Sequence, residues 1–169
     1  MLKKLIQEFL EYLEIEKNRS RLTIRNYNFY LGRFVKWAET QKVTRAEQVN
    51  LDLVRQYRLW LNRFKPVGSL KSASVAAGEL KKNTQNYHLI AVRSFLKYLV
   101  KRDIKSLSPE KIELARMPER QVEFLEGSDL ERLLEAPSKS NSSEAIKRRD
   151  KAILELLFST GLRVSELAG

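Results

Sequence analysis

The sequence contains no cysteine and one histidine among its 169 residues. Without cysteine the chain forms neither disulfides nor cysteine metal sites, and we expect it to work in the reducing cytoplasm. The lone histidine, His88, cannot build a zinc site of the common kinds without other imidazole or thiolate ligands. The sequence therefore predicts no metal, and we interpret His88 as a half-exposed helix residue.

Long apolar runs are also missing, and none of those present would span a bilayer. The opening residues, Met1–Glu8, acquire an acidic side chain too early for a secretory signal and are typical of an amphipathic helix. We therefore expect no membrane partner.

The charge is unevenly distributed along the chain. The net charge is +11, but residues 1–107 carry 22 Lys and Arg against 9 Asp and Glu, whereas residues 108–169 carry 10 against 12. The whole basic excess thus belongs to the first part, which indicates a polyanion-binding domain followed by a segment of different character. A basic surface can also serve solubility alone.

Apolar residues recur at helical spacing in four stretches of the first part. The predicted helices run from Leu2 to about Lys17, from about Leu22 onward, from Val49 to Phe64, and from about Lys82 to Arg102. Small residues at 66–78 predict a flexible loop between the last two. The sequence therefore predicts an all-α fold with a four-helix domain at 1–107.

Periodicity fails from Ile104 to Gln121, and we interpret 108–122 as an interdomain linker. Helical patterns return in 123–169, which we interpret as the start of a second domain. Ser128 or Asp129 has the side chain of a helix N-cap for its first helix.

Basic residues recur along one flank of the fourth predicted helix, and two further cations lie on the second predicted helix. A solvated helix face explains many rows of this kind, but these residues have few acidic neighbours. Lysine-rich faces bind phosphates more readily than they read bases, whereas amide and guanidinium groups at Asn86 and Arg93 match base edges. The candidate polyanion contacts are Arg25, Lys36, Lys82, Asn86, Arg93, Lys97 and Lys101.

A second candidate site lies near residue 163, where the apolar stretch Ala152–Phe158 runs into a glycine turn. Gly161 can supply a left-handed helix end, and Ser165 or Glu166 can support the next first turn. We expect Arg163 to lie at a corner between two buried helices, with its guanidinium held for bidentate contact with a phosphate. The alternative is a surface arginine beside a helix cap.

A cluster of cations precedes this apolar stretch. These residues could contact DNA, but a charged first turn before a buried helix has the same pattern. The cluster comprises Lys147, Arg148, Arg149 and Lys151.

Two segments resemble the tyrosine recombinases, the family of phage integrases and Xer proteins. Thr160–Leu167, with the sequence TGLRVSEL, is similar to the first arginine box of that family. Ser20–Tyr27, followed by Leu31, Phe34 and Trp37, is similar to the opening of its core-binding domain. The resemblance implies a SAM-like four-helix core-binding domain, a linker, and the first helices of a mainly helical catalytic domain.

In that family the arginine of the box contacts the scissile phosphate and the acidic residue three positions on supports the active site. Carried over, these residues are Arg163 and Glu166. The family cuts and rejoins double-stranded DNA through a 3′-phosphotyrosyl intermediate, without a cofactor. The resemblance also implies that the second and fourth helices approach the duplex.

The family's lysine hairpin, its His-x-x-Arg box and its tyrosine nucleophile have no match in these 169 residues. We therefore expect the residues to bind DNA without cleaving it. The full-length parent is expected to act as a homo-tetramer on DNA, and the fragment to be monomeric. The competing hypothesis is a non-catalytic helical DNA-binding protein or regulator derived from a recombinase.

Overall fold

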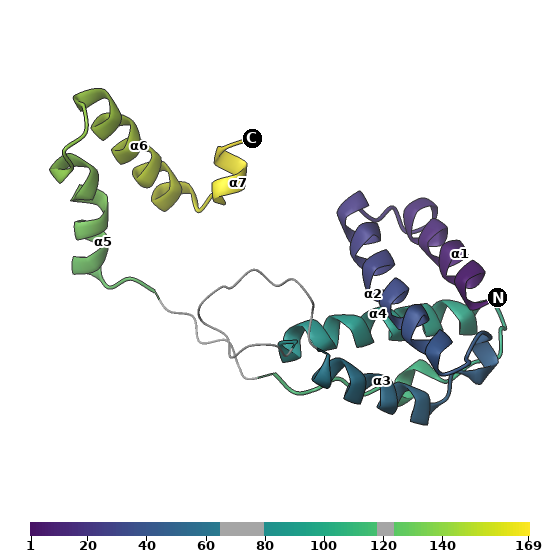
Figure 1. Ribbon diagram of the computed structural model, residues 1–169. Coiled ribbons are helices and arrows are strands. Elements are labelled where there is room, and N and C mark those ends of the chain that lie inside the picture. Colours follow the sequence, from purple (N-terminus) through teal and green to yellow (C-terminus); the bar gives the residue numbers. More distant parts are fainter. Residues whose placement is uncertain (65–79, 118–123) are drawn as a thin grey trace. The chain divides into compact units, whose positions relative to one another are not determined.

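The computed structural model describes residues 1–64, 80–117 and 124–169, and every regular element in these ranges is helical (Figure 1). The chain divides into two compact units, Met1–Pro118 (unit 1) and Glu119–Gly169 (unit 2). None of the described helices is long and apolar enough to cross a membrane. The flexible loop predicted at 66–78 lies outside the described residues.

Unit 1 contains the four predicted helices, which confirms the fold class. They are α1 (Leu2–Ile15), α2 (Arg21–Thr40), α3 (Leu51–Arg63) and α4 (Lys82–Lys101). Single turns of 3₁₀ helix, η1 (Ala46–Gln48) and η2 (Pro109–Lys111), follow α2 and α4.

The starts of α2 and α3 are set by polar caps. The Ser20 hydroxyl accepts a hydrogen bond from the Thr23 amide at 3.3 Å, and the Asn50 side chain accepts one from the Leu53 amide at 2.8 Å. Each cap satisfies one of the amides that a first helical turn leaves without a partner. These local contacts explain why both helices begin within two residues of the predicted position.

Helix α4 is the centre of unit 1, because it packs against α1, α2, α3 and η2. Its side chains at Val92, Phe95 and Leu96 are fully buried. The Phe95 ring meets the Phe9 ring of α1 edge to face, with centroids 5.7 Å apart. This single apolar face, contacted from three sides, gives the unit its core.

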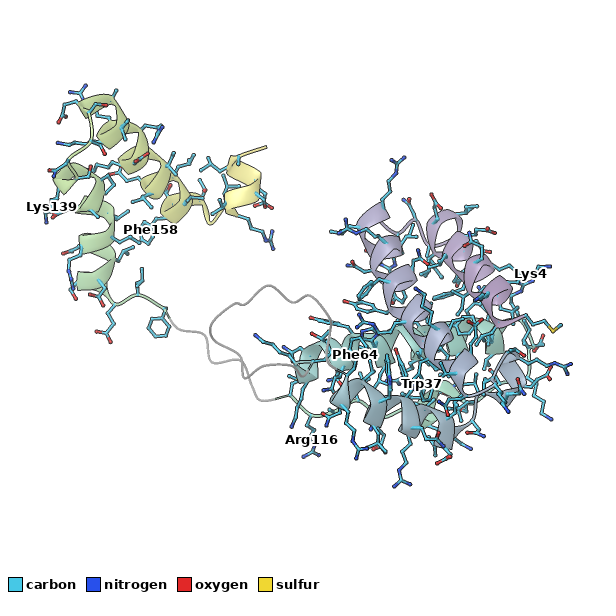
Figure 2. All side chains as sticks on the ribbon, viewed as in Figure 1. Lys4, Trp37, Phe64, Arg116, Lys139 and Phe158 are labelled. Carbon is cyan, nitrogen blue, oxygen red and sulfur yellow. The ribbon has the colours of Figure 1, made fainter. Side chains whose placement is uncertain are left out.

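A cluster of aromatic side chains packs between α2 and α3 and extends the core there. The Tyr57 ring lies 5.0 Å from both Phe34 and Trp37, and the Trp60 ring lies 4.7 Å from Phe64. Trp37 and Phe64 are labelled in Figure 2. Both tryptophans of the chain therefore lie in unit 1.

The first part of the predicted linker is packed on unit 1. Pro109 and Ile112 are buried, and the Asn86 side chain of α4 exchanges two hydrogen bonds with the Ala115 backbone. Periodicity fails here because a single 3₁₀ turn and an extended segment bury isolated side chains rather than a repeating face. These residues are therefore not a free connection.

Unit 2 contains α5 (Gly127–Glu135), the 3₁₀ turn η3 (Ala136–Lys139), α6 (Glu144–Thr160) and α7 (Val164–Leu167). Helix α5 packs on η3 and α6. The N-cap of α5 is Glu126, so the prediction of Ser128 or Asp129 was wrong by two or three positions.

The expectation that buried helices flank Arg163 was also wrong. No residue of α5, α6 or α7 is buried, and Phe158, labelled in Figure 2, is 61% exposed. The apolar spacing predicted the helix correctly, but the three helices of unit 2 have too little volume to enclose a core.

Candidate nucleic-acid interface

The turn between α6 and α7 has the predicted form. Gly161 adopts a left-handed conformation with φ of 66°, and its amide donates to the Leu157 carbonyl at 3.0 Å. Only glycine enters this region at no steric cost, which is why the helix ends there. Arg163 follows in an extended conformation and is the N-cap of α7.

Glu166 holds this corner together. Its Oε2 accepts a hydrogen bond from the Arg163 amide at 2.8 Å, and its Oε1 accepts one from Arg163 Nη1 at 3.0 Å. Of the two residues predicted to support the turn, Glu166 does so, with the reach-back bond of a capping box. One carboxylate therefore orients both the backbone and the guanidinium of Arg163.

The Arg163 side chain is 81% exposed, so solvent rather than protein surrounds most of its guanidinium. A guanidinium has five N–H donors, and the contact with Glu166 uses one of them. The remaining donors suit an oxyanion such as a phosphate. The geometry is compatible with the predicted role and equally with a surface arginine beside a cap.

On α2 and α4 the predicted contacts differ in exposure. Arg25, Lys36, Lys82, Lys97 and Lys101 are exposed. None of these five forms an ion pair with an acidic residue in the described ranges. Surface cations without an ion pair are available to an external anion.

Arg93 is half-buried, and its Nε is enclosed without a hydrogen-bond partner among the described residues. The Glu110 carboxylate lies near Arg93 and Lys97. The pKa of Glu110 is lowered chiefly by its own backbone amide and by the Ser108 hydroxyl, with smaller contributions from the charges of Lys97 and Arg93. The negative charge of Glu110 therefore lowers the positive electrostatic potential around Arg93 and Lys97.

The structure contradicts the prediction that Asn86 reads a base edge. The residue is 7% exposed, its Nδ2 donates to the Ala115 carbonyl at 2.9 Å, and its Oδ1 accepts from the Ala115 amide at 3.0 Å. The amide edge that would pair with a base already pairs with backbone. Helical spacing placed Asn86 on the correct flank but did not reveal the segment that covers it.

His88 is fully buried, so its interpretation as a half-exposed residue was wrong. Its Nε2 lies 3.2 Å from Arg33 Nη1, and its Nδ1 lies 3.3 Å from the Tyr57 hydroxyl. A guanidinium only donates, so Nε2 accepts and the ring is neutral, with its proton on Nδ1. Burial, followed by the charge of Arg33, lowers the pKa of His88 to about 4.

Three cations that lie near His88 or near the lysines of α4 were not identified from the sequence. The Arg33 guanidinium lies 4.7 Å from the ring centres of both Phe29 and Phe64, and Lys17 and Arg19 lie beside Lys97 and Lys101. The spacing of Arg25, Phe29 and Arg33 along α2 could have indicated the first. Lys17 and Arg19 lie in a turn, where no periodicity marks a shared face.

No group of three His, Asp or Glu side chains in the described ranges could hold a metal ion. The exposed cations described above can bind anions through charge and N–H donation.

The comparison with family models decides the class of this chain. Residues 6–103 match the model described as "Phage integrase, N-terminal SAM-like domain". The chain belongs to the phage integrase family. The match begins within α1 and ends two residues after α4, so it covers most of α1 and all of α2, α3 and α4.

Curated relatives extend the similarity into unit 2. The chain is 33% identical over 161 residues to the tyrosine recombinase XerC of Anoxybacillus flavithermus, covering 94% of this chain and 47% of that protein. It is 31% identical over 168 residues to the tyrosine recombinase XerD of Chlorobaculum tepidum, covering 99% and 50%. With the XerC of Bacillus subtilis it shares 32% identity over 165 residues, covering 97% and 49%.

The chain thus spans about half the length of the curated relatives it matches. No solved structure matches it. The resemblance found in the arginine box and the opening of α2 is confirmed at the level of the family.

Proposed function

We propose that this chain is the DNA-binding portion of a site-specific tyrosine recombinase that cuts and rejoins duplex DNA through a 3′-phosphotyrosyl intermediate. The observation that carries the proposal is the set of exposed, unpaired cations on α2 and α4, in a chain that belongs to the phage integrase family. Phosphates supply most of the affinity of proteins for DNA, and such cations bind them.

The DNA-facing residues we propose are Arg25, Lys36, Lys82, Arg93, Lys97 and Lys101. Five of them are exposed, and Arg93 is half-buried at the edge of the row. Their contacts are chiefly to the backbone, which fixes the register of the protein on the duplex.

For unit 2 we propose a chemical rather than a binding role. Arg163 would neutralise charge that builds on the scissile phosphate, and Glu166 would orient it through the two contacts described above. The neighbouring cations are less available, because Lys147, Arg149 and Lys151 each pair with an acid of α6.

The six tyrosines of this sequence all lie in unit 1, where Tyr57 and Tyr98 are buried. This distribution favours DNA binding without cleavage by these 169 residues, as the alternative hypothesis of a non-catalytic DNA-binding protein also requires. For the full-length parent we propose a homo-tetramer on DNA in the cytoplasm, without a cofactor.

The test is binding of the chain to a fluorescent duplex, followed by anisotropy from about 50 to about 300 mM salt. Several phosphate contacts should give a log–log slope steeper than about −3, since each contributes about −0.9. Absence of binding at the lowest salt would refute the proposal. An Arg163→Ala variant should bind within about threefold of the unchanged chain, because one exposed arginine is a small part of the total charge.

A further inference from the structure

A hollow of about 370 Å³ lies where the end of α1, the first half of α2 and the second half of α4 meet. These three helices pack against one another, as Figure 1 shows. None of the residues that line the hollow is an acid. Those that matter for a ligand are four cations and two hydroxyl residues, namely Lys17, Arg19, Lys97, Lys101, Tyr27 and Ser94.

The turn after α1 fixes two of the cations. Asn18 has a positive φ of 45°, which reverses the chain between Lys17 and Arg19. The Lys17 amide donates to the Tyr12 carbonyl at 3.1 Å, and the Arg19 amide donates to the Leu13 carbonyl at 3.0 Å. The backbone of both residues is therefore anchored to the last turn of α1.

The Tyr12 ring draws two ammonium groups to the rim. Lys17 Nζ lies 5.7 Å and Lys101 Nζ 5.3 Å from its centre. The negative face of the ring attracts both cations and offsets their mutual repulsion. Two cations beside one ring raise the positive potential at the rim of the hollow, which favours a bound anion.

Hydroxyl groups supply donors inside the hollow. Tyr27 Oη and Ser94 Oγ lie 3.4 Å apart, at the long end of the range for O–H hydrogen bonds. The hydrogen bond between the two hydroxyls is therefore weak, so each hydroxyl can donate its proton to a ligand instead. Cations at the rim and hydroxyl donors within form a set that matches phosphate oxygens.

The neighbouring hollow on the far side of Tyr12 and Tyr98 shows the contrast. It is lined by Glu8, Glu11 and Glu16 together with Lys101 and Arg102. There the Arg102 guanidinium already contacts Glu8 at 2.6 Å. By comparison, Lys17, Arg19 and Lys97 form no ion pair with a described acid.

We propose that this basic hollow clamps a backbone phosphate of duplex DNA, with Arg19 and Lys97 as the principal contacts and the Tyr27 and Ser94 hydroxyls as additional donors. The inference rests on the proposed function and extends it to Arg19, which lies between α1 and α2, and to the hydroxyls of Tyr27 and Ser94. It gives the turn between α1 and α2 a direct role in binding.

The experiment compares two double variants of the full chain. Arg19→Gln/Lys97→Gln removes two charges from the hollow, and Arg55→Gln/Arg63→Gln removes two exposed charges from α3. We expect the first pair to weaken duplex binding at about 100 mM salt by at least tenfold and to reduce the steepness of the salt slope by about 1 to 2. The second pair should change affinity by less than about threefold.

A set of duplexes, each with one neutral methylphosphonate in place of a phosphate, locates the contact. For the unchanged chain, a methylphosphonate at one or two positions should lower the affinity at least about fivefold. For the Arg19→Gln/Lys97→Gln variant, a methylphosphonate at the same positions should cause no further loss of affinity. Tyr27→Phe and Ser94→Ala, which keep the charge, should each weaken binding at the same positions by about twofold to fivefold.

The outcomes separate the two proposals. If the unchanged chain does not bind duplex DNA, the proposed function fails and the clamp with it. If the chain binds but the hollow and α3 variants lose equal affinity, the clamp alone is refuted. The clamp is also refuted if the hollow variant remains as sensitive to every methylphosphonate as the unchanged chain.

Discussion

The two units differ in what they do with the same kinds of side chain. In unit 1 the apolar stripes of four helices meet around α4 and are buried, whereas in unit 2 the helices leave theirs partly exposed. In unit 2 most cations of α5 and α6 form an ion pair with an acid that is one, three or four residues away in sequence. The exposed cations of α2 and α4 named above form no such pair with a described acid. The spacing of apolar residues thus predicts a helix, whereas the burial of its apolar side chains and the pairing of its charges depend on neighbouring elements.

The largest expected difference is in stability. Phe95→Ala should cost unit 1 about 3 to 5 kcal/mol, because it empties a fully buried position beside Phe9. Phe158→Ala in unit 2 should leave unit 1 unchanged within about 0.5 kcal/mol. Urea unfolding followed by tryptophan fluorescence measures this, since both tryptophans report on unit 1. Equal shifts from the two variants would contradict the difference in packing.

Acid sensitivity is the next largest effect and belongs to unit 1. The folded chain holds the pKa of His88 at about 4 against an ordinary 6.5, so the unfolded chain binds more protons between these values. Stability therefore falls as the pH falls through this window, by about 2 kcal/mol between about pH 8 and about pH 5.

The same fluorescence assay at several pH values checks this. His88→Gln retains a polar group between Arg33 and Tyr57 without a titrating ring, so its stability should vary less over the window. Carboxylates titrate alike in both proteins and cancel in the comparison. An identical pH dependence of the two proteins would show that His88 is not the group responsible.

In unit 2 the expected effects are local. Glu166→Ala removes the acceptor of the Arg163 amide and should raise the hydrogen exchange rate of that amide about fivefold, since a cap contributes about 1 kcal/mol. Glu166→Gln keeps an acceptor oxygen and should raise it by less than about twofold. Exchange followed by NMR distinguishes them, and equal rates in all three proteins would refute the capping role.

The smallest predicted change concerns Glu110. Its carboxylate lies near Arg93 and Lys97, so Glu110→Gln should strengthen duplex binding by about twofold at low salt. Glu47→Gln, at an exposed acid of η1, is the control. Anisotropy titrations of both variants measure the effect, and weaker binding by Glu110→Gln would contradict the proposal that α4 faces DNA.

Much of the fold followed from local rules. Four apolar stripes and the glycine at 161 predicted the helices of unit 1 and the corner at Arg163 within a few residues. These features depend on spacing and on the chemistry of single residues, which a sequence displays directly.

What could not be predicted depends on contacts distant in sequence. Asn86 and His88 lie at helical positions that a charge pattern marks as accessible, yet Ala115 covers one and Arg33 with Tyr57 encloses the other. The hollow likewise joins a turn to a helix far along the chain. No periodicity within α4 carries that information.

The central claim is that unit 1 supplies the affinity for DNA through unpaired cations of α2 and α4. The most direct measurement compares the salt dependence of duplex binding for two triple variants of equal charge change, Arg25→Gln/Lys36→Gln/Lys82→Gln and Lys147→Gln/Arg149→Gln/Lys151→Gln. The first should weaken binding at least tenfold and flatten the log–log slope by about 0.9 for each phosphate that the variant no longer neutralises, while the second changes affinity by less than about threefold. Equal reductions in affinity, or a larger reduction in the second variant, would contradict the claim.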